Sequence, residues 1–192
     1  MRLFVAVMPP ERALAELAAE VAPLRALPGA AELRWAPVDG WHLTLAFLGE
    51  VAEERVPALE DGLAQAAAGY RAHRLRLAGG GRFGDRTLWV GLDGETWALH
   101  ALARAVTQVA GELGCGEGEF SFHPHLTVAR SGRHRRRGAL REEAAALADF
   151  RGAEWEVAEF HLVRSDFTGG RSRYTVLRSW PLAGAEPAAR TG

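Results

Sequence analysis

The sequence contains no lysine, because all 23 of its basic residues are arginine. This absence excludes enzymes that form a lysine Schiff base, nucleotide-binding proteins that need a P-loop lysine, and ligases that adenylate their own lysine. Cysteine is nearly absent as well. The single Cys115 cannot form an internal disulfide, so we interpret it as an incidental thiol in a fold that needs no oxidising compartment.

Long apolar runs are also missing. No stretch approaches the roughly 18 uninterrupted apolar residues of a transmembrane helix. The apolar run at residues 3–8 is too short for the core of a signal peptide. We therefore expect a cytoplasmic protein that does not contact a membrane.

Charge of one sign does not dominate either. The 23 basic residues face 24 acidic ones, which gives a formal net charge of -1. This balance excludes a protein that coats nucleic acid through bulk positive charge, but it allows a local basic groove. The 192 residues suffice for one domain with a core of its own.

Hydrophobic periodicity predicts alternating strands and helices. The strands are expected at residues 3–8, 41–48, 73–77, 87–92, 122–129, 155–163 and 172–180. The helices are expected at residues 11–27, 53–68, 95–113 and 141–149. Glycines 79–81 are expected to begin a loop, and the last two strands are expected to form a hairpin.

The order strand, helix, strand, helix, strand occurs twice, with one extra strand at the end. Phe4 precedes His42 by 38 residues, and Trp89 precedes His125 by 36 residues. The two histidines therefore occupy equivalent places in two half-repeats, about 1–80 and 87–180. We expect one bilobal domain over residues 1–182, in which two pseudo-symmetric lobes face a central cleft, followed by a flexible tail at 183–192.

Each half-repeat contains a His-x-Thr pattern on its central strand. The first copy reads Trp-His-Leu-Thr-Leu from residue 41, and the second reads Pro-His-Leu-Thr-Val from residue 124. Residues two apart on a strand project from the same face. His42 and Thr44 should therefore share one face of their strand, and His125 and Thr127 one face of theirs. If the lobes face each other, two imidazoles and two hydroxyls line one cleft.

This set of side chains suits in-line attack at phosphorus. One neutral imidazole can take a proton from water, and the opposite imidazolium can give a proton to the leaving oxygen. Histidine suits both tasks because its ordinary pKa is roughly 6.5. The threonine hydroxyls can hold the non-bridging phosphate oxygens. The pseudo-symmetry leaves open which histidine is the acid and which is the base.

The chain resembles the two-histidine phosphoesterase superfamily, and within it the RNA 2′,3′-cyclic phosphodiesterases, also called 2′-5′ RNA ligases. The resemblance extends from Arg2 to about Leu182. It is carried by residues 2–10, 41–50, 83–84 with 88–91, and 122–130. The repeated His-x-Thr pattern points to the superfamily, and the Phe-Leu-Gly-Glu and Pro-His-x-Thr-x-Ala-Arg strings point to the narrower family.

The resemblance implies an α+β fold with antiparallel sheets that line the central cleft. It implies hydrolysis of an RNA 2′,3′-cyclic phosphate end to a 2′-phosphate end, with weak reverse 2′-5′ joining. No metal and no nucleotide cofactor would be needed. His42 would be the proton donor and His125 the proton acceptor, while Thr44 and Thr127 would hold the phosphate. The expected partner is RNA with such a terminus, and no obligate protein partner is evident.

Arg130 and His123 flank the second motif. Strict alternation turns Arg130 away from the face that carries His125, so it reaches the phosphate only if the strand ends or bulges after Thr127. The family pattern favours a substrate-binding role for Arg130. His123 shares the parity of His125, but Pro124 disturbs the strand, and we interpret His123 as a supporting residue.

Several features leave alternatives open. The arginine-rich run 133–137 is either a landing strip for the RNA backbone or a solvated loop. Trp35, Trp41 and Phe83 either stack a terminal base or pack in the core. The same motif pair would serve a phosphodiesterase acting on small cyclic nucleotides or ADP-ribose cyclic phosphate, or a binding module without turnover. A metallohydrolase has weak support, because neither motif has zinc-ligand spacing.

Overall fold

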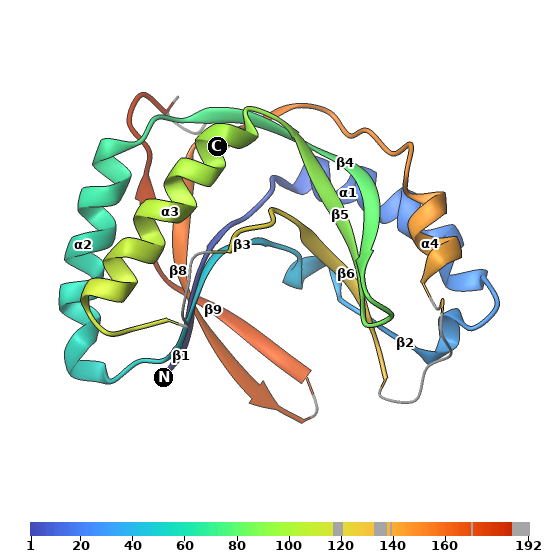
Figure 1. The fold of residues 1–192 in the computed structure, drawn as a ribbon, viewed down its shortest axis with the longest axis horizontal. Helices are drawn as coiled ribbons and strands as arrows, with labels where there is room; N and C mark the ends of the chain where they lie inside the picture. Colours follow the sequence, from blue (N-terminus) through green and yellow to red (C-terminus); the bar gives the residue numbers. More distant parts are fainter. Residues whose placement is uncertain (117–120, 133–137, 139, 170, 186–192) are drawn as a thin grey trace, which may run out of the picture.

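The computed structural model describes residues 1–116, 121–132, 138, 140–169 and 171–185 (Figure 1). In these residues the strands are β1 (Arg2–Val7), β2 (Leu33–Trp35), β3 (Leu43–Glu50), β4 (His73–Phe83), β5 (Thr87–Gly94), β6 (Leu126–Ser131), β7 (Trp155–Val157), β8 (Glu159–Thr168) and β9 (Arg171–Pro181). The α-helices are α1 (Glu11–Val21), α2 (Val56–Gly69), α3 (Thr96–Glu112) and α4 (Arg141–Ala146). Short 3-10 helices occupy Ala22–Ala26, Ala30–Glu32, Val38–Gly40 and Glu53–Arg55.

The strands of the described residues form one curled antiparallel sheet. Its order is β7-β4-β5-β6-β3-β1-β8-β9, and the short β2 pairs with β6 beside this path. The middle strands β3 and β6 are joined at the single pair Leu43–Leu126. Helices α2 and α3 lie at one end of the sheet and α1 and α4 at the other (Figure 1). The expected α+β fold with antiparallel strands is therefore confirmed, and the two expected sheets are halves of one.

The strand order is pseudo-symmetric about the β3–β6 junction. Strand β1 flanks β3 on one side, and β5 flanks β6 on the other. The next strand outward is β8 beside β1 and β4 beside β5, so each half of the sheet takes this strand from the other half of the sequence. This exchange is what two interleaved half-repeats produce.

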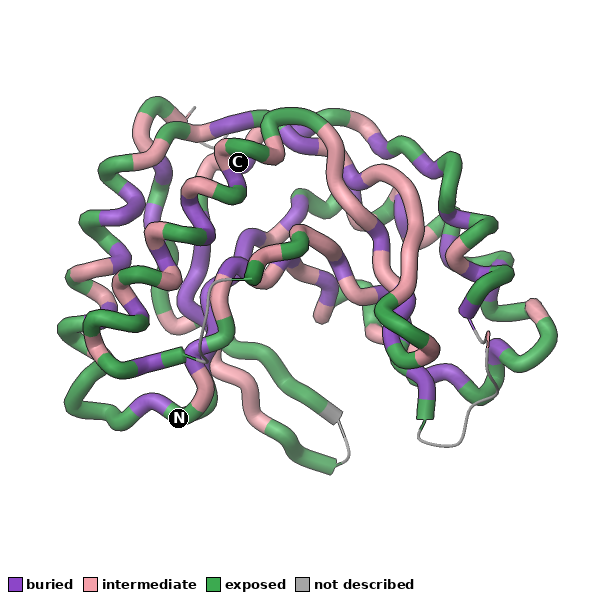
Figure 2. The backbone as a smooth tube through the Cα atoms, viewed as in Figure 1, coloured by how far each residue is buried: buried purple, intermediate pink, exposed green. Residues whose placement is uncertain are grey.

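The two faces of the sheet differ in what they bury. Leu3, Val5 and Val7 of β1 belong to the main core, together with leucines of the helices such as Leu59 and Leu99. On the opposite face, Phe4 and Ala6 pack against Val163 and Met8 in a small separate cluster. Buried and partly exposed residues alternate at the start of β3, and the far end of the β8–β9 hairpin is exposed (Figure 2). The face opposite the helices is therefore free to carry polar groups.

Proline shortens two of the predicted elements. The helix expected at 11–27 remains an α-helix only to Val21, and Pro23 lies in the first turn of the 3-10 helix that follows. The strand expected at 122–129 begins only at Leu126, because Pro124 cannot donate a ladder hydrogen bond. The short helix expected at 141–149 ends at Ala146.

Glycine was misread as a loop signal. Residues 79–81 belong to β4, which runs on to Phe83 and pairs with β5 past a register shift at Ala78–Gly80. Gly79 takes a positive φ of 70° at this irregularity, which a residue without a Cβ adopts without strain. The expected loop is therefore a bulged strand.

Other differences concern the end of the chain and one short strand. The strand expected at 155–163 is two strands, because β7 pairs with β4 whereas β8 pairs with β1 and β9. The three-residue β2 was not predicted. The hairpin of β8 and β9 is confirmed. At the start of the expected tail, Ala183 exchanges backbone hydrogen bonds with Tyr70 and Ala72, while residues 186–192 lie outside the described part.

Candidate active site

The two His-x-Thr segments lie on the adjacent middle strands of the sheet. Leu43 of β3 pairs with Leu126 of β6 in antiparallel register, and both leucines are buried in the main core. One step outward from this pair, the register sets His42 beside Thr127 and Thr44 beside His125. Directly opposite residues project from the same face of a sheet. These four residues therefore lie together at the centre of the sheet, on the face opposite the helices. We call His42, Thr44, His125 and Thr127 the histidine block.

Each imidazole is oriented by a backbone carbonyl two residues before it, in the segment that leads into its strand. Nδ1 of His42 lies 2.8 Å from the carbonyl oxygen of Gly40, and Nδ1 of His125 lies 2.7 Å from the carbonyl oxygen of His123. Since a carbonyl only accepts, Nδ1 of each ring must carry the proton and donate it. Nε2 of each ring is then the atom that can accept a proton from a substrate or donate one to it.

The surroundings favour the neutral form of both rings. Burial lowers the pKa of His42, and the nearby charges of Arg130 and His125 lower it further, against the opposing effect of the Gly40 hydrogen bond. Burial also lowers the pKa of His125, and the charges of His123 and Arg130 add to this effect against the hydrogen bond to the His123 carbonyl. Each ring can therefore act as a base at neutral pH and becomes an acid when an anion favours its protonation.

Aromatic rings border each histidine. The ring of Phe4 lies 4.8 Å from that of His42 and the ring of Tyr174 lies 5.1 Å from it, centroid to centroid. Around His125, the ring of Phe83 is perpendicular at 4.8 Å and that of Trp89 is tilted at 6.4 Å. The sequence repeat had aligned Phe4 with Trp89, and both contribute to the same kind of contact.

Arg130 reaches the histidine face through a β-bulge. Along β5, Trp89 pairs with Thr127 and the preceding Leu88 pairs with Ala129, so Val128 is the extra residue on β6. Val128 and Ala129 are consequently both buried, and the next residue, Arg130, is exposed. The condition for Arg130 to share a face with His125 and Thr127 is met, and the guanidinium is near enough to lower the pKa of both histidines.

The other residues considered from the sequence lie partly in the core and partly beside His125. Trp41 is buried in the core, and Trp35 of β2 is partly buried against the same core, so both prefer packing to base contact. Phe83 is 39% exposed and lies at the edge of His125. His123 is exposed and supplies the carbonyl that orients His125. The arginine-rich run 133–137 lies outside the described residues.

Sequence reasoning missed one ring of the site. Tyr174 of β9 comes from the far hairpin and contacts both Phe4 and His42. No local pattern marks this residue, because it reaches the site only through the pairing of β8 with β1 and β9. Its position would have required the order of the strands.

The described part of the chain has no group of three or more His, Cys, Asp or Glu side chains that could hold a metal ion. Among the same residues, no helix is long and apolar enough to cross a membrane.

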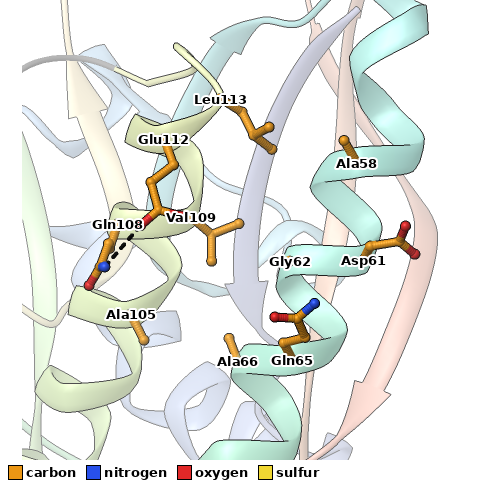
Figure 3. A pocket seen from close by; sticks show the side chains of 10 residues that line it. All are labelled: Ala58, Asp61, Gly62, Gln65, Ala66, Ala105, Gln108, Val109, Glu112 and Leu113. Carbon is orange, nitrogen blue, oxygen red and sulfur yellow. Dashed lines mark hydrogen bonds between the residues drawn. The ribbon is translucent and has the colours of Figure 1, made fainter.

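A groove on the helical side carries different chemistry. It lies between α2 and α3 and is lined mostly by small or uncharged residues such as Ala58, Gly62 and Val109 (Figure 3). A Cβ built on Gly62 would lie 2.6 Å from Cγ1 of Val109, which shows how closely the two helices approach. No member of the histidine block lines this groove.

A curled antiparallel sheet that presents two His-x-Thr segments side by side defines a two-histidine phosphoesterase architecture. The sequence model of the 2′-5′ RNA ligase superfamily matches residues 9–168. The chain belongs to this superfamily, which confirms the resemblance drawn from its motifs.

Individual relatives agree with this assignment. The chain is 35% identical over 147 residues to the RNA 2′,3′-cyclic phosphodiesterase of Escherichia coli, which covers 75% of this chain and 77% of the relative. It is 36% identical over 200 residues to the protein of the same name from Thermus thermophilus, which covers 96% and 91%.

Solved structures show the same fold. The crystal structure of TT0787 from Thermus thermophilus matches with a TM-score of 0.76 at 30% identity, over 97% of this chain and all of that one. That of Escherichia coli LigT complexed with 3′-AMP matches with a TM-score of 0.74 at 30% identity, over 95% and 98%.

Proposed function

We propose that this protein hydrolyses the 2′,3′-cyclic phosphate at the end of an RNA chain to a 2′-phosphate. The observation that carries this proposal is the pair of imidazoles at the starts of adjacent strands, on one face of the sheet, each with Nδ1 donating to a backbone carbonyl oxygen. The relatives of similar length are RNA 2′,3′-cyclic phosphodiesterases by name, which supports the same reaction here.

Proton transfers in opposite directions drive the reaction. The neutral His125 accepts a proton from water at Nε2 as the water oxygen attacks phosphorus. The P–O3′ bond breaks in line with the attack, and the protonated His42 gives its Nε2 proton to the leaving 3′-oxygen. The phosphate stays on the 2′-oxygen. His125 then returns its proton to solvent and His42 takes one up, which restores the starting state.

The other side chains stabilise the negative charge that develops on the phosphate. Thr44 and Thr127 offer hydroxyl donors beside the two imidazoles, and Arg130 offers a guanidinium. Charge-assisted donors are the stronger ones in a partly buried site. The choice of His42 as acid follows the family assignment, since the two rings have the same kind of anchor.

The nature of the product tests the reaction. The protein is incubated with an oligonucleotide that ends in a 2′,3′-cyclic phosphate, and the end group is identified. The proposal expects a 2′-phosphate and a free 3′-hydroxyl, with chelator present or absent. A 3′-phosphate would mean that the other ester bond is cut, and an unchanged substrate would leave only a binding module.

Small cyclic nucleotides are the second candidate substrates. Escherichia coli LigT has been crystallised with 3′-AMP, with NADP+ and with ATP, so a relative accepts single nucleotides in its crystals. Rates on a cyclic mononucleotide and on a longer RNA separate the two candidates. The reverse joining of a 2′-phosphate end to a 5′-hydroxyl end is expected to be slow in water.

A further inference from the structure

A second arginine stands beside Arg130 on the face that carries the histidines. Strand β2 pairs with β6 in antiparallel register, and this register sets Arg34 directly opposite Arg130. The neighbours of Arg34 on β2, Leu33 and Trp35, both belong to the packing of the main core. Arg34 itself is exposed, as is Arg130. The alternation therefore places both guanidinium groups on the face of the sheet that carries the histidines.

The bulge in β6 puts Arg130 and Arg34 on the same face of the sheet as the histidine block. Past the bulge, Arg130 pairs with Thr87 on β5 and with Arg34 on β2. Before the bulge, Thr127 pairs with Trp89. Thr87 and Trp89 are two residues apart on β5 and share a face. Arg34, Arg130 and Thr127 therefore share one face of the sheet.

Two arginines in this position are unfavourable without an anion. The Cβ atoms of directly opposite residues are about 5 Å apart, and like charges there are destabilising. In the described part of the chain, no carboxylate lies within 4.0 Å of either guanidinium. Within the described residues, the pair is therefore left to solvent or to a bound anion for screening.

Strand β2 is held firmly enough for Arg34 to keep this position. Nε1 of Trp35 donates to the carbonyl oxygen of Ala30 at 3.0 Å, and the guanidinium of Arg25 lies 5.4 Å above the Trp35 ring. The backbone nitrogen of Ala36 also donates to the carbonyl oxygen of Val128 at 2.9 Å, which ties β2 to the bulge itself. Arg34 is thus presented by an ordered strand.

We propose that Arg34 binds the phosphodiester that precedes the terminal cyclic phosphate of an RNA chain, next to the terminal phosphate that Arg130 contacts. Arg34 stands opposite Arg130, three positions beyond Thr127 on β6, which corresponds to roughly 7–10 Å along a bulged strand. Successive phosphates of an extended single strand are separated on this scale. The site therefore selects chains of two or more nucleotides over cyclic mononucleotides, an inference that rests on the proposed function.

Substrate length gives the test. Steady-state kinetics are measured for the wild type and for Arg34→Ala on 2′,3′-cyclic CMP and on a tetranucleotide that ends in the same cyclic nucleotide. We expect Arg34→Ala to raise KM for the tetranucleotide about tenfold, the effect of one charge-assisted contact, and to leave the mononucleotide constants unchanged. Arg34→Lys should recover part of the loss, because it keeps the charge.

Salt dependence and a matched control complete the experiment. One phosphate contact fewer should reduce the slope of log KM against log salt by about 0.7 for the tetranucleotide. Arg12→Ala is the control, because it removes an arginine of α1 whose side chain is 82% exposed. It should change neither KM for the tetranucleotide nor the salt dependence of that KM. Thermal unfolding of Arg34→Ala should show no loss of stability, since the substitution removes a repulsion rather than a contact.

The outcomes separate this proposal from the proposed function. A wild type without hydrolysis of either substrate would overturn the function itself. A wild type that hydrolyses the tetranucleotide, with an unchanged KM in Arg34→Ala, would overturn the second phosphate site alone. An equal rise in KM for both substrates would overturn it too, because Arg34 would then act on the terminal nucleotide.

Discussion

Substitution of Gly81 by alanine should disturb the site without touching any group that contacts substrate. Gly81 of β4 pairs with Trp89 of β5, and Trp89 in turn pairs with Thr127 of β6. A Cβ built on Gly81 would overlap Cζ2 and Cη2 of the Trp89 indole and lie 2.8 Å from Cε2. Because ordinary carbon contacts begin near 3.5 Å, the indole must move by on the order of 1 Å.

The size of the effect follows from what the indole touches. The Trp89 ring lies 5.0 Å from His123 and 6.4 Å from His125, centroid to centroid. Overpacking of this kind costs about 1–3 kcal/mol of the free energy of unfolding. A displacement of about 1 Å in the support of a reacting group can cost roughly 10²-fold in rate. We expect kcat of Gly81→Ala to fall by about that factor.

The assay is hydrolysis of a cyclic-phosphate oligonucleotide, with thermal unfolding measured on the same samples. Gly111→Ala is the matched control, because nothing lies within 4 Å of a Cβ at this helical position. It should keep the wild-type rate and gain a few tenths of a kcal/mol or more in stability. Wild-type kcat in Gly81→Ala, with an unchanged Tm, would refute the claim that Trp89 packed on Gly81 positions His125.

Three further predictions concern charge and pH. Burial lowers the pKa of His42 and of His125 in the free protein. The plot of kcat/KM against pH should therefore be bell-shaped, with its maximum below about pH 6.5. A plateau that extends to pH 8 would contradict this prediction. As pH falls, the unfolded chain takes up protons on these two histidines at a higher pH than the native protein does, so the free energy of unfolding should decrease below about pH 6.5. Urea titrations at several pH values measure this decrease. It should be smaller in the double variant with glutamine at both positions. Arg130→Gln removes a positive charge that lowers the pKa of both imidazoles, so the plot of kcat/KM against pH should move to higher pH. The rate at the maximum should drop about tenfold. An unmoved profile would mean that the guanidinium does not lie near the two histidines.

Local alternation was enough to predict that His42 shares a face with Thr44 and that His125 shares a face with Thr127. The leucines between and beyond them face the core, which fixes His42 with Thr44 and His125 with Thr127 on one side of their strands. That the two strands are neighbours was not contained in either motif. It depends on the single pairing of Leu43 with Leu126, which joins residues 83 positions apart.

Arg130 shows where alternation fails. The sequence offers no Gly or Pro at the bulge, and the adjacent apolar residues Val128 and Ala129 fit a regular strand as well as a bulged one. Only the pairing with β5 reveals that both are buried on the same side. Arg34 was missed for a related reason, since a three-residue strand is too short to show a period.

The glycines at 79–81 were misread because their role is non-local. A Cβ on Gly81 would meet Trp89, and one on Gly80 would meet Leu147, so small residues there permit contact with other elements. In the sequence alone, consecutive glycines predict a turn. The conflict between local propensity and tertiary packing falls beside the histidine block.

The proposed reaction requires the two imidazoles of His42 and His125 to act together on one phosphate. The most direct measurement is the rate of hydrolysis of a cyclic-phosphate oligonucleotide by His42→Ala, by His125→Ala and by the double variant, with Tm confirming that each is folded. Each single variant should lose about 10²–10⁴-fold, and the double variant little more, because the two groups serve one reaction step. Wild-type activity in either single variant would contradict the account.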